Sequence, residues 1–272
     1  LKHRTPAKKS DPAVFQQGRK SMGLKLCISL QSYATAFVSL FTNRVKPIAK
    51  AMATTPKTAS LAADTKGLLI GSVTIASYSS IAAHWLPEVI SRFQSDYPQI
   101  KITMLEGCRT EVVKWLDDKL ADVAFMSYRE PFPYDWIPLS EDRMMALLPR
   151  EHPCARLDSF TFELCRNEKL ILPGFGHDDD VIPLFDEFGI EPDIRFSTVE
   201  SFSALQMVEK GLGISIMNEL ITRNWPCEIV KLPISPPRSI SFGIALNYLR
   251  HSSPAVKRFV KYSESIIKKK NK

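Results

Sequence analysis

The stretch LLIGSVTIASYSSIAAHWLPEVISRFQSDYPQIKITMLEG, residues 68–107, decides the fold of this 272-residue chain. Residues 68–76 form an apolar run rich in β-branched side chains, which is typical of a buried strand. An amphipathic helix follows, with apolar residues from Leu86 to Phe93 on one face. Residues 100–104 then alternate apolar and polar side chains, which indicates a second strand.

The same alternation continues beyond this stretch. The apolar side chains of residues 112–120, Leu120 included, share one helix face, and residues 122–126 predict a short third strand. Strands that alternate with helices form a parallel sheet with right-handed crossovers. Ligands of such sheets bind beyond the carboxyl ends of the strands. The expected strand ends are residues 77–80, 107–108 and 126–127.

A second α/β unit follows a predicted strand at residues 144–148. Its expected strands are residues 169–172, 194–196 and 214–217, and its expected helices are residues 183–188 and 202–210. Gly211 and Gly213 follow a helix, whereas a phosphate-binding glycine loop opens one, so we interpret them as a structural turn. A strand at residues 240–246 and a helix at residues 254–267 are expected to return to the first unit.

Four blocks in this order resemble the effector-binding domain of LysR-type transcriptional regulators. They are the opening stretch, LDDKLADVAFM (116–126), WIPLSEDRMMALLPREHP (136–153) and ESFSALQMVEKGLGISIMNE (200–219). The resemblance implies an α/β fold of the type 2 periplasmic-binding-protein class, in which two lobes joined by two crossover strands close over an effector. It also implies a homodimer or homotetramer that associates through the first lobe. The expected domains are 67–151 for lobe I, 152–240 for lobe II, and 241–272 for the return strand and helix of lobe I.

Residues 1–66 have a different character from the rest of the chain. They carry 12 Lys or Arg and two Asp or Glu, a net charge of +10, which leaves −3 for the other residues out of a total of +7. The family that the chain resembles begins with a DNA-binding winged helix-turn-helix, and these residues show no clear pattern of that kind. We expect a degenerate or truncated DNA-binding module and linker, whose charge favours either contact with DNA or a solvated end.

Composition narrows the functional classes. Five cysteines without C-x-x-C spacing argue against a disulfide framework or a zinc ribbon and favour the cytoplasm. No run reaches the ~18 apolar residues of a membrane span, and residues 22–36 make a poor secretory signal because polar residues interrupt their apolar core. No nucleophile elbow or pair of carboxylates favours an enzyme, and no motif indicates a cofactor.

Candidate effector contacts gather at the predicted strand ends of both lobes. Hydroxyls and free N–H groups of residues 77–80 can hold a carboxylate at the start of a helix, or can cap that helix. Cys108 is either a small packed residue or an oxidant-sensitive thiol. The predicted contacts are Ser77, Tyr78, Ser79, Ser80, Cys108, Met126, Ser127, Phe175, Thr198, Val199, Glu200 and Ser201.

Two acidic features of the second lobe have alternative interpretations. Glu200 either caps its helix, which we favour, or selects a cationic or hydroxylated ligand. Residues 177–180, His-Asp-Asp-Asp, contain metal-ligating types, but cation sites draw ligands from alternate positions, so we expect a solvated loop and no metal.

Two functions fit these patterns. The first is a LysR-type regulator that senses a small effector, for example one bearing a carboxylate, between its lobes and thereby modulates DNA-dependent transcription. The alternative is a periplasmic-type solute-binding protein for a small anionic metabolite, which requires a secretory signal.

Overall fold

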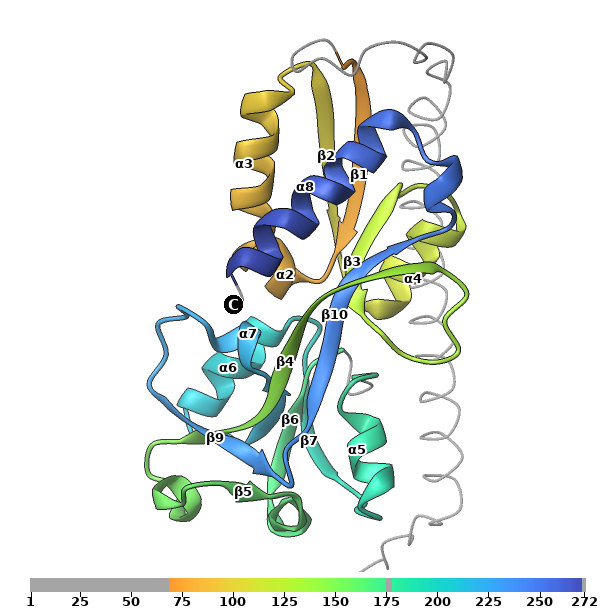
Figure 1. The fold of residues 1–272 in the computed structure, drawn as a ribbon. Coiled ribbons are helices and arrows are strands. Elements are labelled where there is room, and N and C mark those ends of the chain that lie inside the picture. Colours follow the sequence, from red (N-terminus) through yellow and green to blue (C-terminus); the bar gives the residue numbers. More distant parts are fainter. Residues whose placement is uncertain (1–68, 175–177, 271–272) are drawn as a thin grey trace, which may run out of the picture. The chain divides into compact units, whose positions relative to one another are not determined.

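The computed structural model describes residues 69–174 and 178–270, which form two α/β lobes (Figure 1). The first-lobe sheet has the order β2–β1–β3–β10–β4, and β1 pairs in parallel with β2 and β3, as predicted. Its strands are β1 (Gly71–Ser77), β2 (Ile100–Glu106), β3 (Val123–Ser127), β10 (Ser239–Leu246) and the first part of β4 (Asp135–Pro149). Its helices are α2 (Ser79–His84), α3 (Leu86–Asp96), α4 (Arg109–Asp117), the 3-10 helix η4 (Leu249–His251) and α8 (Pro254–Lys270).

The second lobe is built around the other part of β4. That part pairs antiparallel with β8 (Ser215–Asn218) and β9 (Ile229–Ser235), and β5 (Phe160–Thr161) pairs in parallel with β9. β6 (Lys169–Leu172) and β7 (Asp193–Ser197) pair in parallel, and the Ile171 N–H donates to the Ile214 carbonyl at 2.9 Å beside β8. The helices are α5 (Ile182–Glu187), α6 (Ser201–Glu209), α7 (Glu219–Thr222), and the 3-10 helices η1 (Pro153–Arg156) and η2 (Phe162–Asn167).

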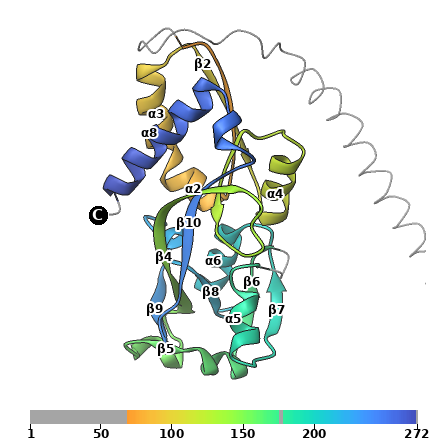
Figure 2. The ribbon, with the colours of Figure 1, turned by 45° about the vertical axis from the view of Figure 1, so that its right-hand side comes forward.

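Two neighbouring segments connect the lobes (Figures 1 and 2). β4 pairs with β10 over residues 135–143 and with β8 and β9 from residue 144 onward, while β9 leads into β10. The two predicted crossover strands are therefore confirmed. The prediction of a strand at residues 144–148 captured only the second part of β4, because Asp142 and its polar neighbours interrupt the apolar pattern. The predicted domain boundaries stay predictions.

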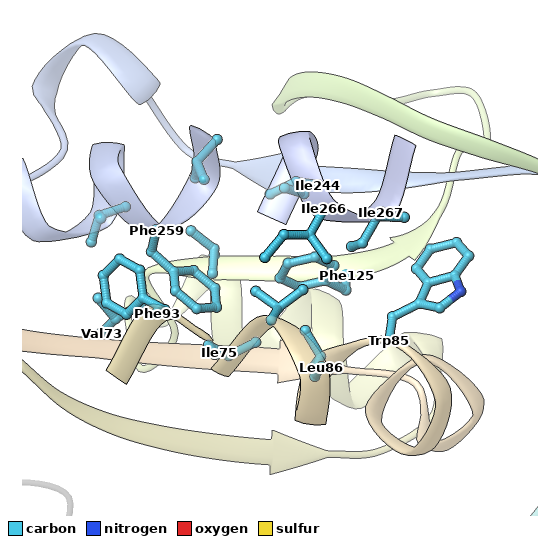
Figure 3. Close-up of a cluster of buried hydrophobic side chains, with 14 of the residues drawn as sticks. Val73, Ile75, Trp85, Leu86, Phe93, Phe125, Ile244, Phe259, Ile266 and Ile267 are labelled. Atoms are coloured by element: carbon cyan, nitrogen blue, oxygen red, sulfur yellow. The ribbon is translucent and has the colours of Figure 1, made fainter. Parts of the chain in front are cut away.

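The core of the first lobe lies between the sheet and the helices α3 and α8. Figure 3 shows Phe259, Ile266 and Ile267 on α8 among side chains of β1, β3 and α3. The rings of Phe259 and Phe93 pack edge to face with their centroids 5.1 Å apart. The prediction that the last helix packs on the first lobe is thus confirmed.

The turn at Gly211 and Gly213 serves the second lobe structurally. Gly211 ends α6 with φ +73°, a conformation that glycine adopts at little cost. A Cβ on Gly213 would lie 2.4 Å from the Lys169 carbonyl oxygen, so only glycine allows β6 and β8 to approach this closely. Both glycines lie between the end of α6 and the start of β8, and neither opens a helix. The interpretation as a structural turn is therefore confirmed.

Some local predictions were wrong. The strand end expected at residues 77–80 is shorter, because α2 already begins at Ser79. Leu120 lies beyond the end of α4 and is 40% exposed. The sequence patterns also did not predict β5, β9 and α7, because these elements are short or interrupted by proline. Among the described residues, no helix is long and apolar enough to cross a membrane.

Candidate functional site

The carboxyl ends of β1, β2 and β3 meet at one edge of the first-lobe sheet, as predicted. Ser77 lies in register with Glu106 of β2 and with Phe125 of β3. The Gly107 N–H donates to the Ser77 carbonyl at 3.1 Å, and the Tyr78 N–H donates to the Phe125 carbonyl at 3.3 Å. These bonds hold the strand ends together, so the residues that follow them can act as one group.

Tyr78, Arg109 and Ser127 form a hydrogen-bonded group at this edge, which we name the Arg109 cluster. Arg109 Nη1 donates to the Ser127 carbonyl at 2.9 Å, to Ser127 Oγ at 3.2 Å and to Tyr78 Oη at 3.4 Å. The two hydroxyl oxygens lie 3.1 Å apart, and the Arg109 side chain is only 16% exposed. A shielded guanidinium beside two hydroxyls can bind an anion strongly.

Sequence reasoning found two members of the Arg109 cluster and missed the third. Tyr78 and Ser127 were predicted from their places at strand ends, and the structure brings them together. Arg109 is the first residue of α4 and directly follows Cys108. A basic residue immediately after a strand end is a signal that could have identified it.

Carboxylates of the second lobe reach this cluster. Ser127 Oγ lies 2.9 Å from both carboxylate oxygens of Asp180. Asp179 Oδ2 lies 4.0 Å from Arg109 Nε, and Asp179 Oδ1 lies 3.2 Å from Arg129 Nη1. The expectation of a solvated loop is therefore wrong for Asp178 to Asp180, which are partly buried; His177 lies outside the described residues.

A second contact between the lobes joins α2 to the start of α6. Ser79 Oγ donates to Glu200 Oε2 at 2.7 Å, and Thr198 Oγ1 donates to the Glu200 carbonyl at 2.9 Å. Glu200 is the N-cap residue of α6, but its side chain makes no capping hydrogen bond. The favoured prediction of side-chain capping by Glu200 is therefore wrong, because its carboxylate faces a hydroxyl of the other lobe.

Burial disfavours the ionised forms of the acidic groups in and beside the Arg109 cluster. Burial raises the pKa of Asp178 to about 7, and the negative charge of Asp180 adds to the rise. Burial also raises the pKa of Asp180, although the hydrogen bond from Ser127 and the charge of Arg109 oppose that rise. Burial and the Asp180 charge raise the pKa of Tyr78 strongly, so its hydroxyl keeps its proton. The protonated phenol can therefore donate to Ser127 Oγ, which lies 3.1 Å away.

The other predicted contacts have different surroundings. Ser77 is fully buried and its hydroxyl donates to the Tyr78 carbonyl, while Ser80 is buried in α2. Met126 is fully buried in an apolar group of the first lobe, and Tyr78 packs against that group. Cys108 caps α4, since its side chain accepts from the backbone of Glu111 while the Glu111 carboxylate accepts from its N–H.

The remaining predicted residues lie at the start of α6 or outside the described chain. Val199 is 48% exposed, and Ser201, the first residue of α6, is partly buried. Phe175 lies outside the described residues. Their predicted contacts with an effector stay predictions.

One group with metal-ligating types lies away from this site, in the second lobe. The ligand atoms of His152, Cys154 and Glu168 lie within 4.8 Å of one another. However, His152 Nδ1 accepts a hydrogen bond from the Cys154 N–H, so Nε2 carries the proton and faces Glu168 at 3.1 Å. This tautomer has no free lone pair on Nε2 for a metal, so the geometry favours an ordinary polar contact.

Comparison with known proteins identifies the family. The family model described as LysR substrate binding domain matches residues 66–265. The chain belongs to the LysR family. The chain is 26% identical over 213 residues to the uncharacterized HTH-type transcriptional regulator YvbU of Bacillus subtilis (strain 168). The aligned region covers 78% of this chain and 73% of YvbU.

Solved structures share the fold of this LysR chain. The effector binding domain of QuiR in complex with shikimate has a TM-score of 0.66 at 23% identity, covering 74% of this chain and 99% of that domain. Full-length CbnR in complex with its target DNA has a TM-score of 0.58 at 20% identity, covering 73% of this chain and 69% of CbnR. The predicted type 2 periplasmic-binding-protein fold is therefore confirmed.

The family assignment also decides between the predicted functions. LysR proteins are transcriptional regulators, not enzymes, and they bind small-molecule effectors and DNA. This chain carries the effector-binding domain of such a regulator. The prediction of a LysR-type regulator is confirmed over the solute-binding alternative.

Proposed function

We propose that this LysR chain senses a small effector that bears a carboxylate, and that the Arg109 cluster binds that carboxylate. The observation that carries the proposal is the convergence of Arg109 Nη1 with the Ser127 and Tyr78 hydroxyls within 3.4 Å. The Asp180 carboxylate against Ser127 supports the choice of ligand, because the cluster already accommodates that chemical group. Shikimate, the ligand of the QuiR domain, is itself a hydroxylated carboxylic acid.

The second lobe supplies the other side of the proposed site. Glu200 accepts a hydrogen bond from Ser79, so it can also accept one from a hydroxyl group of an effector. Thr198, Val199 and Ser201 lie beside it at the start of α6. An effector that contacts both lobes binds one lobe arrangement better than another, and it shifts the regulator toward that arrangement.

A ligand screen on the full chain tests the proposal. A panel of small carboxylates, shikimate included, is added while the thermal unfolding of the wild type is followed. An effector at about 100 times its dissociation constant stabilises the folded state by about 2.7 kcal/mol. Arg109→Gln should abolish that stabilisation, whereas Arg92→Gln, which removes an exposed cation of α3, should leave it intact. A carboxylate that stabilises the Arg109→Gln and wild-type chains equally would refute the assignment.

The edge of the first-lobe sheet supports a homodimer or homotetramer. β2 is an edge strand, and a hollow of about 550 Å³ beside it is lined by Ile90, Ile102 and Met104 among others. Met104 is 37% exposed, and an exposed apolar edge favours association with another chain. We expect Met104→Lys to shift the molar mass in light scattering toward the monomer, and an unchanged mass would contradict this interface.

The site of DNA contact and the compartment are also proposals. Residues 1–66, the predicted DNA-binding segment, lie outside the described residues. Their charge of +10 supports contact with DNA.

We place the regulator in the cytoplasm, which the four free cysteines of the described residues support. Cell fractionation tests the compartment, and recovery in a periplasmic extract would contradict it.

A further inference from the structure

The Ser127 hydroxyl is saturated with hydrogen bonds inside the Arg109 cluster. Its single proton points to the Asp180 carboxylate, whose two oxygens both lie 2.9 Å away. Its oxygen accepts from Arg109 Nη1 at 3.2 Å and from Tyr78 Oη at 3.1 Å. A hydroxyl has one donor and two acceptor sites, so no further partner fits. Any other carboxylate that is to accept from Ser127 must displace Asp180.

Asp180 also has a direct route to the segment that joins the lobes. It lies two residues before α5, and the end of α5 contacts Arg238, which lies between β9 and β10. The Arg238 guanidinium pairs with Glu187 and lies 5.4 Å from the centre of the Phe188 ring. Asp180 and α5 thus link the Ser127 contact to the connection between the lobes through adjacent residues and one ion pair.

We propose that Asp180 is an internal carboxylate ligand that occupies the effector's subsite on Ser127, beside the charge of Arg109, and holds the two lobes together until an effector replaces it. This inference rests on the proposed function, since it deepens the regulation of the same site. The internal ligand sets the effector concentration at which the regulator responds. If Asp180 occupies the subsite about 90% of the time, its removal strengthens the apparent effector affinity about tenfold.

The test replaces the internal carboxylate with a free one. Asp180→Ala removes the side-chain carboxylate, and sodium acetate is the matching small molecule. In the full chain, acetate should raise the melting temperature of Asp180→Ala more than an equal concentration of sodium chloride does. The wild type should show a smaller difference, because Asp180 occupies its subsite. Asp186→Ala, which removes an exposed carboxylate of α5, is the matched control and should behave as the wild type does.

Two further variants make the result specific. Asp180→Ala combined with Ser127→Ala should lose the acetate response, because the donor is gone. Asp180→Asn fills the same space without the charge, so acetate should not stabilise it. If Asp180→Ala does not fold, Ser127→Ala tests the contact from the other lobe: it removes the hydroxyl that donates to Asp180, so hydrogen–deuterium exchange over residues 178–188 should be faster than in the wild type.

The outcomes separate this inference from the proposed function. Equal acetate responses in Asp180→Ala and Asp186→Ala, or unchanged exchange in Ser127→Ala, would overturn it. An effector that needs Arg109 but binds the wild type and Asp180→Ala with the same affinity would also overturn it, while leaving the proposed function intact. An acetate response specific to Asp180→Ala, without any effector from the carboxylate panel, would support the internal ligand and count against the proposed function.

Discussion

Asp178 offers a direct measure of the cost of burying carboxylates beside the Arg109 cluster. Its Oδ1 accepts a hydrogen bond from the Asp180 N–H at 2.9 Å, and its carbonyl accepts from the Ile182 N–H at 2.9 Å. Burial raises its pKa to about 7. Asp178→Asn keeps an oxygen at the same position and removes the charge, so the variant isolates the electrostatic contribution.

The sign of the effect follows from the direction of the pKa change. The pKa of Asp178 is higher in the folded chain than its ordinary value of 3.8, so the folded state binds the proton more tightly. Stability is therefore complete below about pH 4, falls as the pH rises toward about 7, and stays low above that value. Asp178→Asn has no carboxylate to titrate, so it does not lose this stability as the pH rises. The difference in unfolding free energy between the variant and the wild type should therefore grow from about pH 4 to about pH 7.

The size of the effect follows from the same values. The difference between 3.8 and about 7 corresponds to at most about 4.5 kcal/mol, at about 1.4 kcal/mol per pH unit. Asp178 keeps some contact with solvent, so we expect about half of this amount. Asp178→Asn should thus raise the free energy of unfolding by about 2 kcal/mol near pH 8 and by nearly nothing near pH 4.

Urea unfolding of the full chain across this pH range measures the prediction. The quantity of interest is the difference in unfolding free energy between variant and wild type, because groups that titrate identically in both cancel. Asp186→Asn, at an exposed position of α5, is the matched control and should give a smaller gain near pH 8 than Asp178→Asn does. A gain from Asp178→Asn that is constant with pH, or that shrinks as the pH rises, would refute the reasoning.

Three other changes have expected outcomes. Phe259→Ala removes a ring that packs on Phe93, so denaturation should show a loss of about 3–5 kcal/mol in unfolding free energy. Gly213→Ala pushes a Cβ against the Lys169 carbonyl, so it should cost about 2 kcal/mol in the same assay. In gel-shift assays the full chain should bind DNA of any sequence and lose that binding as salt rises, because residues 1–66 carry a charge of +10.

Matched controls make these three outcomes specific. Tyr248→Ala removes a ring that is 69% exposed and should change stability little. Gly71→Ala places its Cβ 3.5 Å from the Cβ of Ala255, an ordinary contact, and should be tolerated. A chain without residues 1–66 should not shift DNA; equal binding by that chain would place the DNA contact in the effector domain.

The sequence predicted most of the fold because local patterns report local structure. The alternation at residues 100–104 and the apolar run at residues 68–76 identified β2 and β1. The first part of β4 was not predicted, because Asp142 interrupts its apolar pattern. Asp142 is nevertheless buried, since its carboxylate accepts hydrogen bonds from Asn218 Nδ2 at 2.7 Å and from the Leu220 N–H at 2.8 Å. Such bonds to residues 76 and 78 positions away leave no periodic trace in the sequence.

The site was harder to predict than the fold for the same physical reason. Strand ends located Tyr78 and Ser127, since the carboxyl ends of parallel strands meet at one sheet edge. The role of Asp180 depends on how the second lobe faces the first, and its contact with Ser127 spans 53 positions in sequence. Three adjacent aspartates favour a solvated loop on composition alone, and only the arrangement of the lobes buries them.

The contacts between the lobes are of a kind that a small ligand can outweigh. Each lobe has its own apolar core, and Leu220 of α7 packs against the core of the first lobe. The contacts at the candidate site itself are polar, from Ser79 to Glu200 and from Ser127 to Asp180. A hydrogen bond to a charged group contributes about 1.5–3 kcal/mol, and an effector at about 100 times its dissociation constant contributes about 2.7 kcal/mol. Because these energies are similar, an effector that replaces one such contact can shift the lobe equilibrium without disturbing either core.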